Sequence, residues 1–331
     1  MRFKFLIVLL ITVINYSCAQ EGNSSSNGSS PSSPSSKSKD NSSTLSIAEE
    51  RLFAFEQKVE YELMQLEESF ANQQFAEAAG STMAWDVKEL RPKAQQSGGQ
   101  LVDGKREGLW VFVHPEEGYI EAKGRYESDE REGVWEFFYE DGQVKMSGNF
   151  KNGLHDGLWS RWHSSGELWE TSNWKAGEKE GEQKSYTMSG RLKESLNFSK
   201  GILQGKAMNY FLDTGILESQ GAYLGGFKYG KWLYYMVNGA IEKEITFNLG
   251  KQDGAFVLYG ANGKKRVKGY YRDGKRHGLW SYYYTNGILA IQGYYENGKR
   301  EGQWNFKYDI VPRSKTGFYE NGRKVGDVER N

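Results

Sequence analysis

Turn residues recur along most of the chain at a fixed interval and separate stretches of about five to seven residues. From residue 101 onwards, DGKREGLW (103–110), DGKRHGLW (273–280) and NGKREGQW (297–304) share one pattern. The second glycine of this pattern recurs at spacings of 24 or 25 residues, at Gly108, Gly133, Gly157, Gly181, Gly205, Gly230, Gly254, Gly278, Gly302 and Gly326. Such a period is typical of a repeat protein, here with nine full units and a truncated tenth. We call these ten residues the anchor glycines.

Each unit contains two turn signals. One resembles Asn286-Gly287, and the other opens the next unit, as in Asn297-Gly298. Asn-Gly and Asp-Gly favour tight hairpins because the central residues of such turns adopt positive φ. The sequence therefore predicts an all-β fold, an elongated antiparallel meander of about ten 24-residue β-hairpin repeats. The two 25-residue units carry their extra residue inside a turn, before Gly118 and before Gly215, so the strands keep their register.

Three positions of the unit are repeatedly aromatic. Two residues after the anchor glycine stand Trp110, Trp135, Trp159, Trp232, Phe256, Trp280 and Trp304. Five residues after it stand Phe138, Trp162, Tyr186, Tyr210, Tyr235, Tyr259 and Tyr283. Late in the second strand stand Tyr126, Phe150, Trp174, Phe198, Tyr223, Phe247, Tyr271, Tyr295 and Tyr319, which we expect to form the core. The first two rows are an odd number of residues apart and would point to opposite faces of a flat strand, so either the sheet coils and buries both or one row is exposed.

Before the repeats, residues 46–80 follow a helical pattern. Ser46 and Glu49 match a capping box, and apolar residues then recur at three- and four-residue spacing. The sequence predicts an amphipathic helix over 46–80, followed by a connecting segment over 81–100 and the repeat domain over 101–331. The helix is expected to cover the open end of the repeats or to pair with a partner helix. Its exposed face would be acidic, with Glu49, Glu50, Glu56, Glu60, Glu67 and Glu68.

The N-terminal residues 1–20 have the pattern of an export signal, with a short basic segment followed by an apolar core that is too short to span a membrane. Cleavage before Cys18 would leave a lipidated cysteine that anchors the chain to a membrane. Cleavage after Ala19 would give a secreted or periplasmic protein. Residues 21–45 are rich in serine and predict a disordered linker. We therefore expect an exported protein of the cell envelope.

Composition and charge narrow the function classes. The 331 residues carry 43 basic and 43 acidic side chains, and this zero net charge argues against nucleic-acid binding. With one cysteine and four scattered histidines, no zinc site can be assembled from Cys and His. No catalytic, cofactor-binding or metal-binding residue is expected, so the sequence predicts a protein that is not an enzyme. Charge is polarised: residues 103–141 hold twelve acids and five bases, and residues 264–276 hold seven bases and one acid.

Tryptophans are concentrated in the third unit, with Trp159, Trp162, Trp169 and Trp174. Trp169 lies outside the three regular rows. Exposed tryptophans favour contacts with proteins or sugars, whereas buried ones would form a locally bulkier core. We take these four residues as candidate partner-binding residues. The partner would be a protein or, in the alternative, a carbohydrate of the cell wall.

The units resemble MORN-type repeats, specifically the bacterial variant of the YwqK family of antitoxins. The matching signature is Y-x-x-G-K-x-x-G-x-W-x-x-Y-x-x-x-G, as in YYRDGKRHGLWSYYYTNG (270–287). The resemblance covers residues 101–326 and implies an interaction scaffold, with an antitoxin role in a toxin-antitoxin system. Gln183 and Ala207 depart from it where tryptophan is expected. GKWLYYMVNGAI (230–241) is also similar to choline- or glucan-binding repeats, which would imply a carbohydrate-binding module.

Overall fold

The computed structural model describes residues 37–80 and 98–330. The chain divides into two units, residues 1–44 and residues 45–331. In the first unit, only residues 37–44 are described, and they are helical. The expected export signal, Cys18 and the first part of the serine-rich linker lie outside the described residues. These assignments remain predictions.

One helix and twenty-one strands make up the described chain. The helix is α2 (Lys37–Gly80). The strands of the first half are β1 (Gly98–Val102), β2 (Lys105–Val113), β3 (Ile120–Glu127), β4 (Glu130–Phe138), β5 (Val144–Lys151), β6 (Leu154–Trp162), β7 (Leu168–Lys175), β8 (Glu178–Tyr186), β9 (Leu192–Ser199), β10 (Ile202–Leu203) and β11 (Gly205–Tyr210). Those of the second half are β12 (Leu217–Leu224), β13 (Phe227–Tyr235), β14 (Ile241–Asn248), β15 (Lys251–Tyr259), β16 (Lys265–Arg272), β17 (Lys275–Tyr283), β18 (Leu289–Glu296), β19 (Lys299–Lys307), β20 (Ser314–Glu320) and β21 (Arg323–Arg330).

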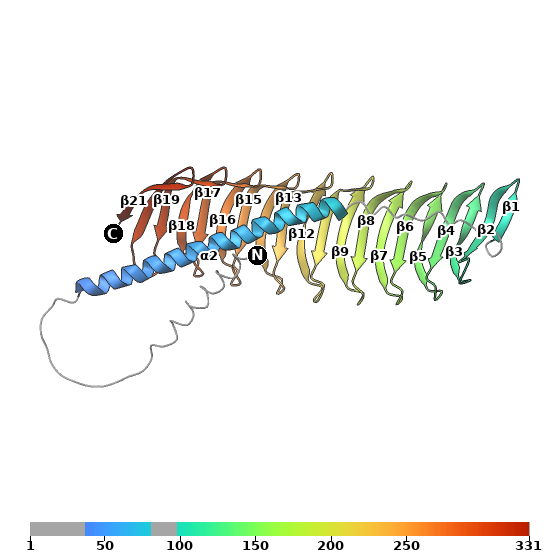
Figure 1. Ribbon diagram of the computed structural model, residues 1–331, viewed down its shortest axis with the longest axis horizontal. Coiled ribbons are helices and arrows are strands. Elements are labelled where there is room, and N and C mark those ends of the chain that lie inside the picture. Colours follow the sequence, from blue (N-terminus) through green and yellow to red (C-terminus); the bar gives the residue numbers. More distant parts are fainter. Residues whose placement is uncertain (1–36, 81–97, 331) are drawn as a thin grey trace, which may run out of the picture. The chain divides into compact units, whose positions relative to one another are not determined.

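The strands form one antiparallel sheet in which each strand pairs with its neighbours in sequence, from β1–β2 to β20–β21 (Figure 1). Most neighbouring strands pair with a one-residue register shift, and one strand is interrupted, between β9 and β12. There, β10 and β11 both pair with β9 and are two parts of one interrupted strand. The break is at Gln204, whose backbone N–H still donates to the carbonyl of Asn197. The predicted all-β meander of hairpin repeats is therefore confirmed.

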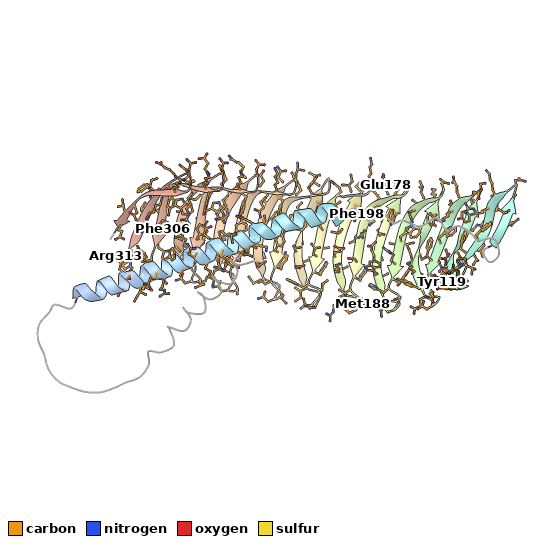
Figure 2. All side chains as sticks on the ribbon, in the orientation of Figure 1. Tyr119, Glu178, Met188, Phe198, Phe306 and Arg313 are labelled. Atoms are coloured by element: carbon orange, nitrogen blue, oxygen red, sulfur yellow. The ribbon has the colours of Figure 1, made fainter. Side chains whose placement is uncertain are left out.

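The two kinds of turn lie at opposite ends of the strands, along the two long sides of the sheet. Glu178 follows a turn on one long side, and Met188 lies in a turn on the other (Figure 2). In turns that open a unit, such as Asn297-Gly298, both residues have positive φ, as a two-residue hairpin requires. On the other long side of the sheet, both central turn residues were also expected to have positive φ. This expectation is wrong for turns such as 139–143. There only Gly142 has positive φ, because the loop is longer and closes through a hydrogen bond from Gly142 N–H to Tyr139 O.

The core is built from tryptophans that lie flat on glycines of the preceding strand. A Cβ atom built on Gly269 would stand 2.2 Å from the indole of Trp280, so only glycine leaves room for the ring. The indole N–H of Trp280 also donates to the carbonyl of Tyr270 at 3.1 Å. The same arrangement joins Trp135 to Gly124 and to the carbonyl of Arg125. We call the side of the sheet that carries these tryptophans the core face and the other side the outer face.

Two of the three aromatic rows share the core face. The ring of Tyr271, from the late row, meets Trp280 edge to face at 5.2 Å, and both are buried. The row five residues after the anchor glycine, which includes Tyr259 and Tyr283, lies on the outer face and is half-buried. Gln183 and Ala207, which replace tryptophan in units four and five, are nevertheless buried on the core face. The sequence left the burial of the two odd-spaced rows open, and the structure separates them by alternation along the strand.

Two expected boundaries differ from the structure. Helix α2 begins at Lys37, nine residues before Ser46, so Ser46 lies inside the helix and cannot act as its N-cap. The end of the expected linker is therefore helical, because serine signals a helix start only where the preceding residues are not helical. The sheet begins at Gly98, inside the expected connecting segment, because Gly99 lies beneath Trp110 as the strand glycines of later units do.

Candidate functional site

Six of the ten repeat positions two residues before an anchor glycine hold a cation that lies over aromatic rings of the core face. These cations are Arg106, Arg131, Lys179, Lys228, Arg276 and Arg300. The guanidinium of Arg300, for example, lies 4.4 Å from the ring centre of Trp304 and 5.3 Å from that of Tyr319. A cation held over an aromatic face is attracted by the negative potential of the ring. We call this repeat position the cation position.

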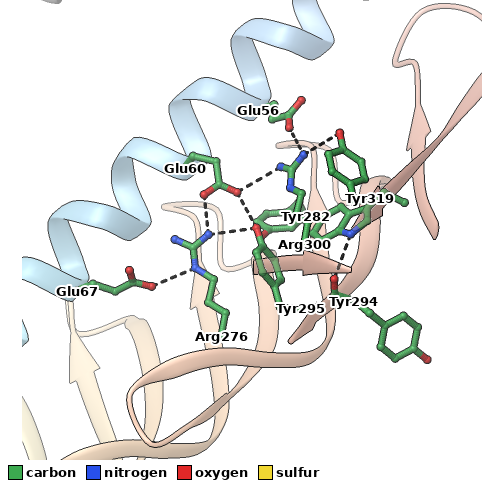
Figure 3. A network of polar contacts seen from close by, with 10 residues as sticks. Glu56, Glu60, Glu67, Arg276, Tyr282, Tyr294, Tyr295, Arg300 and Tyr319 are labelled. Carbon is green, nitrogen blue, oxygen red and sulfur yellow. Dashed lines mark hydrogen bonds and ion pairs between the residues drawn. The ribbon is translucent and has the colours of Figure 1, made fainter. Parts of the chain in front are cut away.

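Helix α2 packs against the core face through glutamates that pair with two of these cations (Figure 3). Glu60 accepts a hydrogen bond from Arg276 at 2.6 Å and another from the hydroxyl of Tyr295 at 3.0 Å. Arg300 pairs with Glu56 at 2.5 Å and with Glu60 at 3.4 Å. Because one carboxylate serves two arginines from neighbouring units, the network ties the helix to both units at once.

Further contacts extend this network towards the C-terminal end of the helix. Glu67 accepts hydrogen bonds from Arg276 and from the hydroxyl of Tyr271. Arg266 pairs with Glu62 at 2.8 Å. Burial alone would raise the pKa of Glu60, but the charges of the two arginines outweigh burial and hold the pKa below its ordinary value. The carboxylate is therefore charged near neutral pH.

The helix and the sheet share a common step. Seven helical residues advance by about 10.5 Å, and two adjacent strands span about 9.6 Å. A helix that crosses the strands therefore presents every seventh residue to an equivalent place on the next unit. Leu52 and Val59 are seven residues apart, and both are buried among residues of the core face. Glu60 and Glu67 are also seven residues apart: Glu60 pairs with Arg300, and Glu67 pairs with Arg276 at the same position of the neighbouring unit.

Two expectations about the helix are corrected by these contacts. Glu56, Glu60 and Glu67 were expected on the exposed face, but they lie against the sheet because buried arginines need carboxylate partners. Helix residues between Leu45 and Leu66 also pack on the core face of the C-terminal units instead of covering an open end. Two of the seven basic residues of 264–276, Arg266 and Arg276, are therefore paired with glutamates of α2.

The outer face of the C-terminal units carries an exposed strip of three aromatic residues and one leucine. Its members are Tyr270, Leu279, Tyr294 and Phe318, with exposed fractions of 56%, 43%, 55% and 39%. Leu279 and Tyr294 stand directly opposite each other on β17 and β18. Tyr270 and Tyr294 are one unit apart, which corresponds to about 9.6 Å across two strand spacings. We call these four residues the outer strip.

The repeat frame does not require the aromatic residues of the outer strip. Tyr270 and Tyr294 each precede a tyrosine that is buried on the core face. In the six earlier units the corresponding position holds Arg125, Asn149, Asn173, Asn197, Ala222 or Thr246. Since six units fold with a polar or small residue there, the aromatic residues of the last three units have no role in forming the core. The adjacent pairs Tyr-Tyr and Phe-Tyr were the sequence signal for this strip, and the row analysis considered only one member of each pair.

The four candidate tryptophans of unit three do not form one surface. Trp159 is 3% exposed and belongs to the core, so its ring is not available to a partner. Trp169 is 38% exposed, with the guanidinium of Arg161 4.3 Å from its ring centre. Trp162 and Trp174 are half-buried. A binding role for the three accessible tryptophans remains a prediction.

The histidines are dispersed over the described residues, where no group of three or more His, Cys, Asp or Glu side chains is placed to hold a metal ion. His155 packs against Trp159 and Trp174. Its burial, together with the nearby charge of Arg131, lowers its pKa to about 4. Within 37–80 and 98–330, no helix has the length and apolar character of a membrane span.

Comparison with protein families finds a known repeat in three segments of the chain. Residues 131–152, 276–297 and 290–308 match the model of the MORN repeat variant. These three segments are MORN-variant repeats. A search of curated proteins finds no match to the chain. In this chain, the MORN-variant signature specifies the core: its tryptophan lies on a strand glycine, and its late tyrosine meets that tryptophan edge to face.

Proposed function

We propose that this protein is an exported, non-enzymatic MORN-variant scaffold that binds a protein partner at the cell envelope through the outer strip. The observation that supports the proposal is the exposure of aromatic side chains at positions where folding does not require them. Exposed tyrosines next to apolar residues are enriched in the energetically important centres of protein interfaces.

The rim of the outer strip indicates the chemistry of the partner. Lys268 and Arg272 flank Tyr270 on the same side of β16, and both are exposed. A partner surface with an apolar ridge and acidic residues near this end would complement the strip. Export rests on the pattern of residues 1–20, and anchoring rests on Cys18 as a lipidation site.

The resemblance to the YwqK family suggests a finer hypothesis, in which the partner is a toxin. An export signal argues against a cytoplasmic toxin, so under this hypothesis the functional chain would start after the signal. The carbohydrate alternative would rely on Trp162 and Trp169 instead of the outer strip. These hypotheses differ in the residues on which binding depends, which allows one experiment to separate them.

The test compares partner capture by the full chain and by two variants. Tyr270→Ala combined with Tyr294→Ala removes the centre of the outer strip. Tyr229→Ala removes an exposed tyrosine outside the strip and is the matched control. The captured protein is identified by mass spectrometry, purified, and its affinity for each variant is measured. We expect at least tenfold weaker binding by the double variant and unchanged binding by the control.

Two results would contradict the proposal. One is equal affinity of the partner for the double variant and the unaltered chain. The other is binding to an arrayed glycan that is lost in Trp162→Ala and Trp169→Ala but retained in the double variant. The second result would establish the carbohydrate function in its place.

A further inference from the structure

The first and last described strands of the sheet each have one edge without a partner strand. Among the described residues, β1 pairs only with β2, and β21 pairs only with β20. An unpaired edge presents a row of backbone N–H and C=O groups that can pair with another strand. Proteins usually protect such edges with charged residues, bulges or a covering segment.

Both edge strands of this sheet also expose apolar side chains. Leu101 is exposed in β1, and Val325 and Val328 are exposed in β21. The β1 segment, Gly98–Val102, contains no charged residue, whereas β21 carries three basic and two acidic residues beside its exposed valines. Exposed apolar residues on an open edge favour association instead of preventing it.

The two ends of the repeat array carry opposite charge. Residues 103–141, which follow β1, hold twelve acids against five bases, a net charge of −7. Residues 313–330, which form β20 and β21 with the segment before them, hold five bases against three acids, a net charge of +2. The acidic first end of one molecule is therefore electrostatically complementary to the basic last end of another. Repulsion between two acidic ends opposes the association of two first ends.

In a typical unit, the first strand carries the anchor glycine and the second strand carries the glycine that lies beneath a tryptophan. Strand β1 has the sequence features of a second strand. Gly99 lies beneath Trp110 as Gly124 lies beneath Trp135, which is the role of the second strand of a hairpin. The last strand, β21, carries the anchor glycine Gly326 and so corresponds to a first strand. When β1 of one copy is placed beside β21 of another, the order of first and second strands continues across the junction.

We infer that the sheet associates head to tail, with β1 of one copy pairing antiparallel with β21 of a second copy. The contact is heterologous, because it joins two different surfaces of the same protein. Repetition of this contact adds copies in a row and produces open-ended chains of molecules. Such chains would present several outer strips to a partner and raise the apparent affinity through multivalency.

Sedimentation velocity of the full chain over a range of concentrations tests this inference. We expect the unaltered chain to form species larger than a monomer, with a fraction that rises with concentration. Leu101→Lys and Val328→Lys place charge on the two edges, so either variant should remain monomeric over the same range. Val134→Lys changes an equally exposed apolar residue in an interior strand and should associate like the unaltered chain.

A disulfide experiment identifies the surfaces that meet. The only cysteine of the chain is Cys18, so Cys18→Ser gives a background without cysteine. Leu101→Cys together with Val328→Cys should form disulfide-linked ladders on oxidation, whereas Val134→Cys with Val328→Cys should not. A monomer at all concentrations, or association that Val134→Lys abolishes as fully as the edge variants do, would overturn the inference. Neither result bears on the outer strip, whose test uses different variants.

Discussion

Units one to three and units seven to nine of this protein have separate cores of similar construction but differ in what packs on them. In both regions a tryptophan lies on a glycine, and a cation lies over the rings, as with Arg131 over Trp135 and Arg276 over Trp280. In the C-terminal region the cation pairs with glutamates of α2. Among the described residues, the core cluster around Trp135 contains no helix residue. The comparison separates what the repeat needs in order to fold from what it can additionally bind.

The outer faces of the two regions also differ, and again the C-terminal region has the additional feature. The position before the late tyrosine is Arg125, Asn149 or Asn173 in the first three units and Tyr270, Tyr294 or Phe318 in the last three. The C-terminal region therefore adds helix contacts on the core face and exposed aromatic rings on the outer face. Repeat proteins tolerate such local specialisation because each unit is stabilised mainly by its neighbours.

The largest expected effect is the loss of a core tryptophan, and it should be alike in the two regions. Trp135→Ala and Trp280→Ala each remove a ring that is fully buried and hydrogen-bonded to a backbone carbonyl. We expect a loss of about 3–5 kcal/mol in the free energy of unfolding for either variant. Urea unfolding followed by circular dichroism measures this change. A loss below about 1 kcal/mol in either region would show that the ring is not part of the core there.

A smaller effect should distinguish the two regions at one repeat position. Arg276→Gln leaves Glu60 and Glu67 without their shared partner, which we expect to cost about 3 kcal/mol because an unpaired carboxylate would remain partly buried. Arg131→Gln removes a cation that, among the described residues, forms no ion pair. We expect this variant to lose about 1 kcal/mol, the value of the cation–ring contact. Equal losses in urea unfolding would contradict the difference between the regions.

The pH dependence should also differ between the two regions. His155 has a pKa of about 4 in the folded chain and 6.5 as an isolated side chain, so the unfolded state binds the proton first. Its unit should therefore lose stability as the pH falls from about 6.5 towards 4. Glu60 has a folded pKa below its ordinary 4.5, so its contribution is present above pH 4.5 and is lost as the pH falls through the lower, folded value. An NMR titration of His155 with a midpoint near 6.5 would contradict the first expectation.

The smallest effect concerns the outer strip. Tyr270→Ala and Tyr294→Ala remove exposed rings that do not contribute to the core. We expect each variant to change the free energy of unfolding by less than about 0.5 kcal/mol. A loss of several kcal/mol for either would mean that the ring stabilises the fold, and the argument for a binding role would fail. Arg125→Ala is the control at the same repeat position in the first unit.

The meander could be predicted from the sequence because each unit contains its own turns and core residues. Asn297-Gly298 specifies a turn, and Trp304 and Tyr319 mark the buried side of their strands. The extra residues before Gly118 and Gly215 also fall in turns, where the backbone N–H of each glycine bonds a carbonyl four residues earlier. These features are local, so a pattern along the chain is sufficient to find them.

The position of the helix could not be predicted, because it depends on contacts between distant residues. Glu60 and Arg276 are 216 residues apart, and nothing in the helical pattern indicates that its acidic residues would find buried arginines. The outer strip was missed for a different reason. The row analysis included only one tyrosine of each adjacent pair, whereas alternation along the strand sends Tyr271 to one face and Tyr270 to the other.

The central claim is that α2 stabilises the C-terminal units while the first units are stabilised by their own rings. Hydrogen exchange of the full chain, compared with that of Glu60→Gln, tests this claim most directly. We predict faster exchange in α2 and in β16–β20, because the carboxylate that links Arg276 to Arg300 is lost. Exchange in β2–β6 should be unchanged. Faster exchange across the whole sheet, or no change in β16–β20, would contradict the claim.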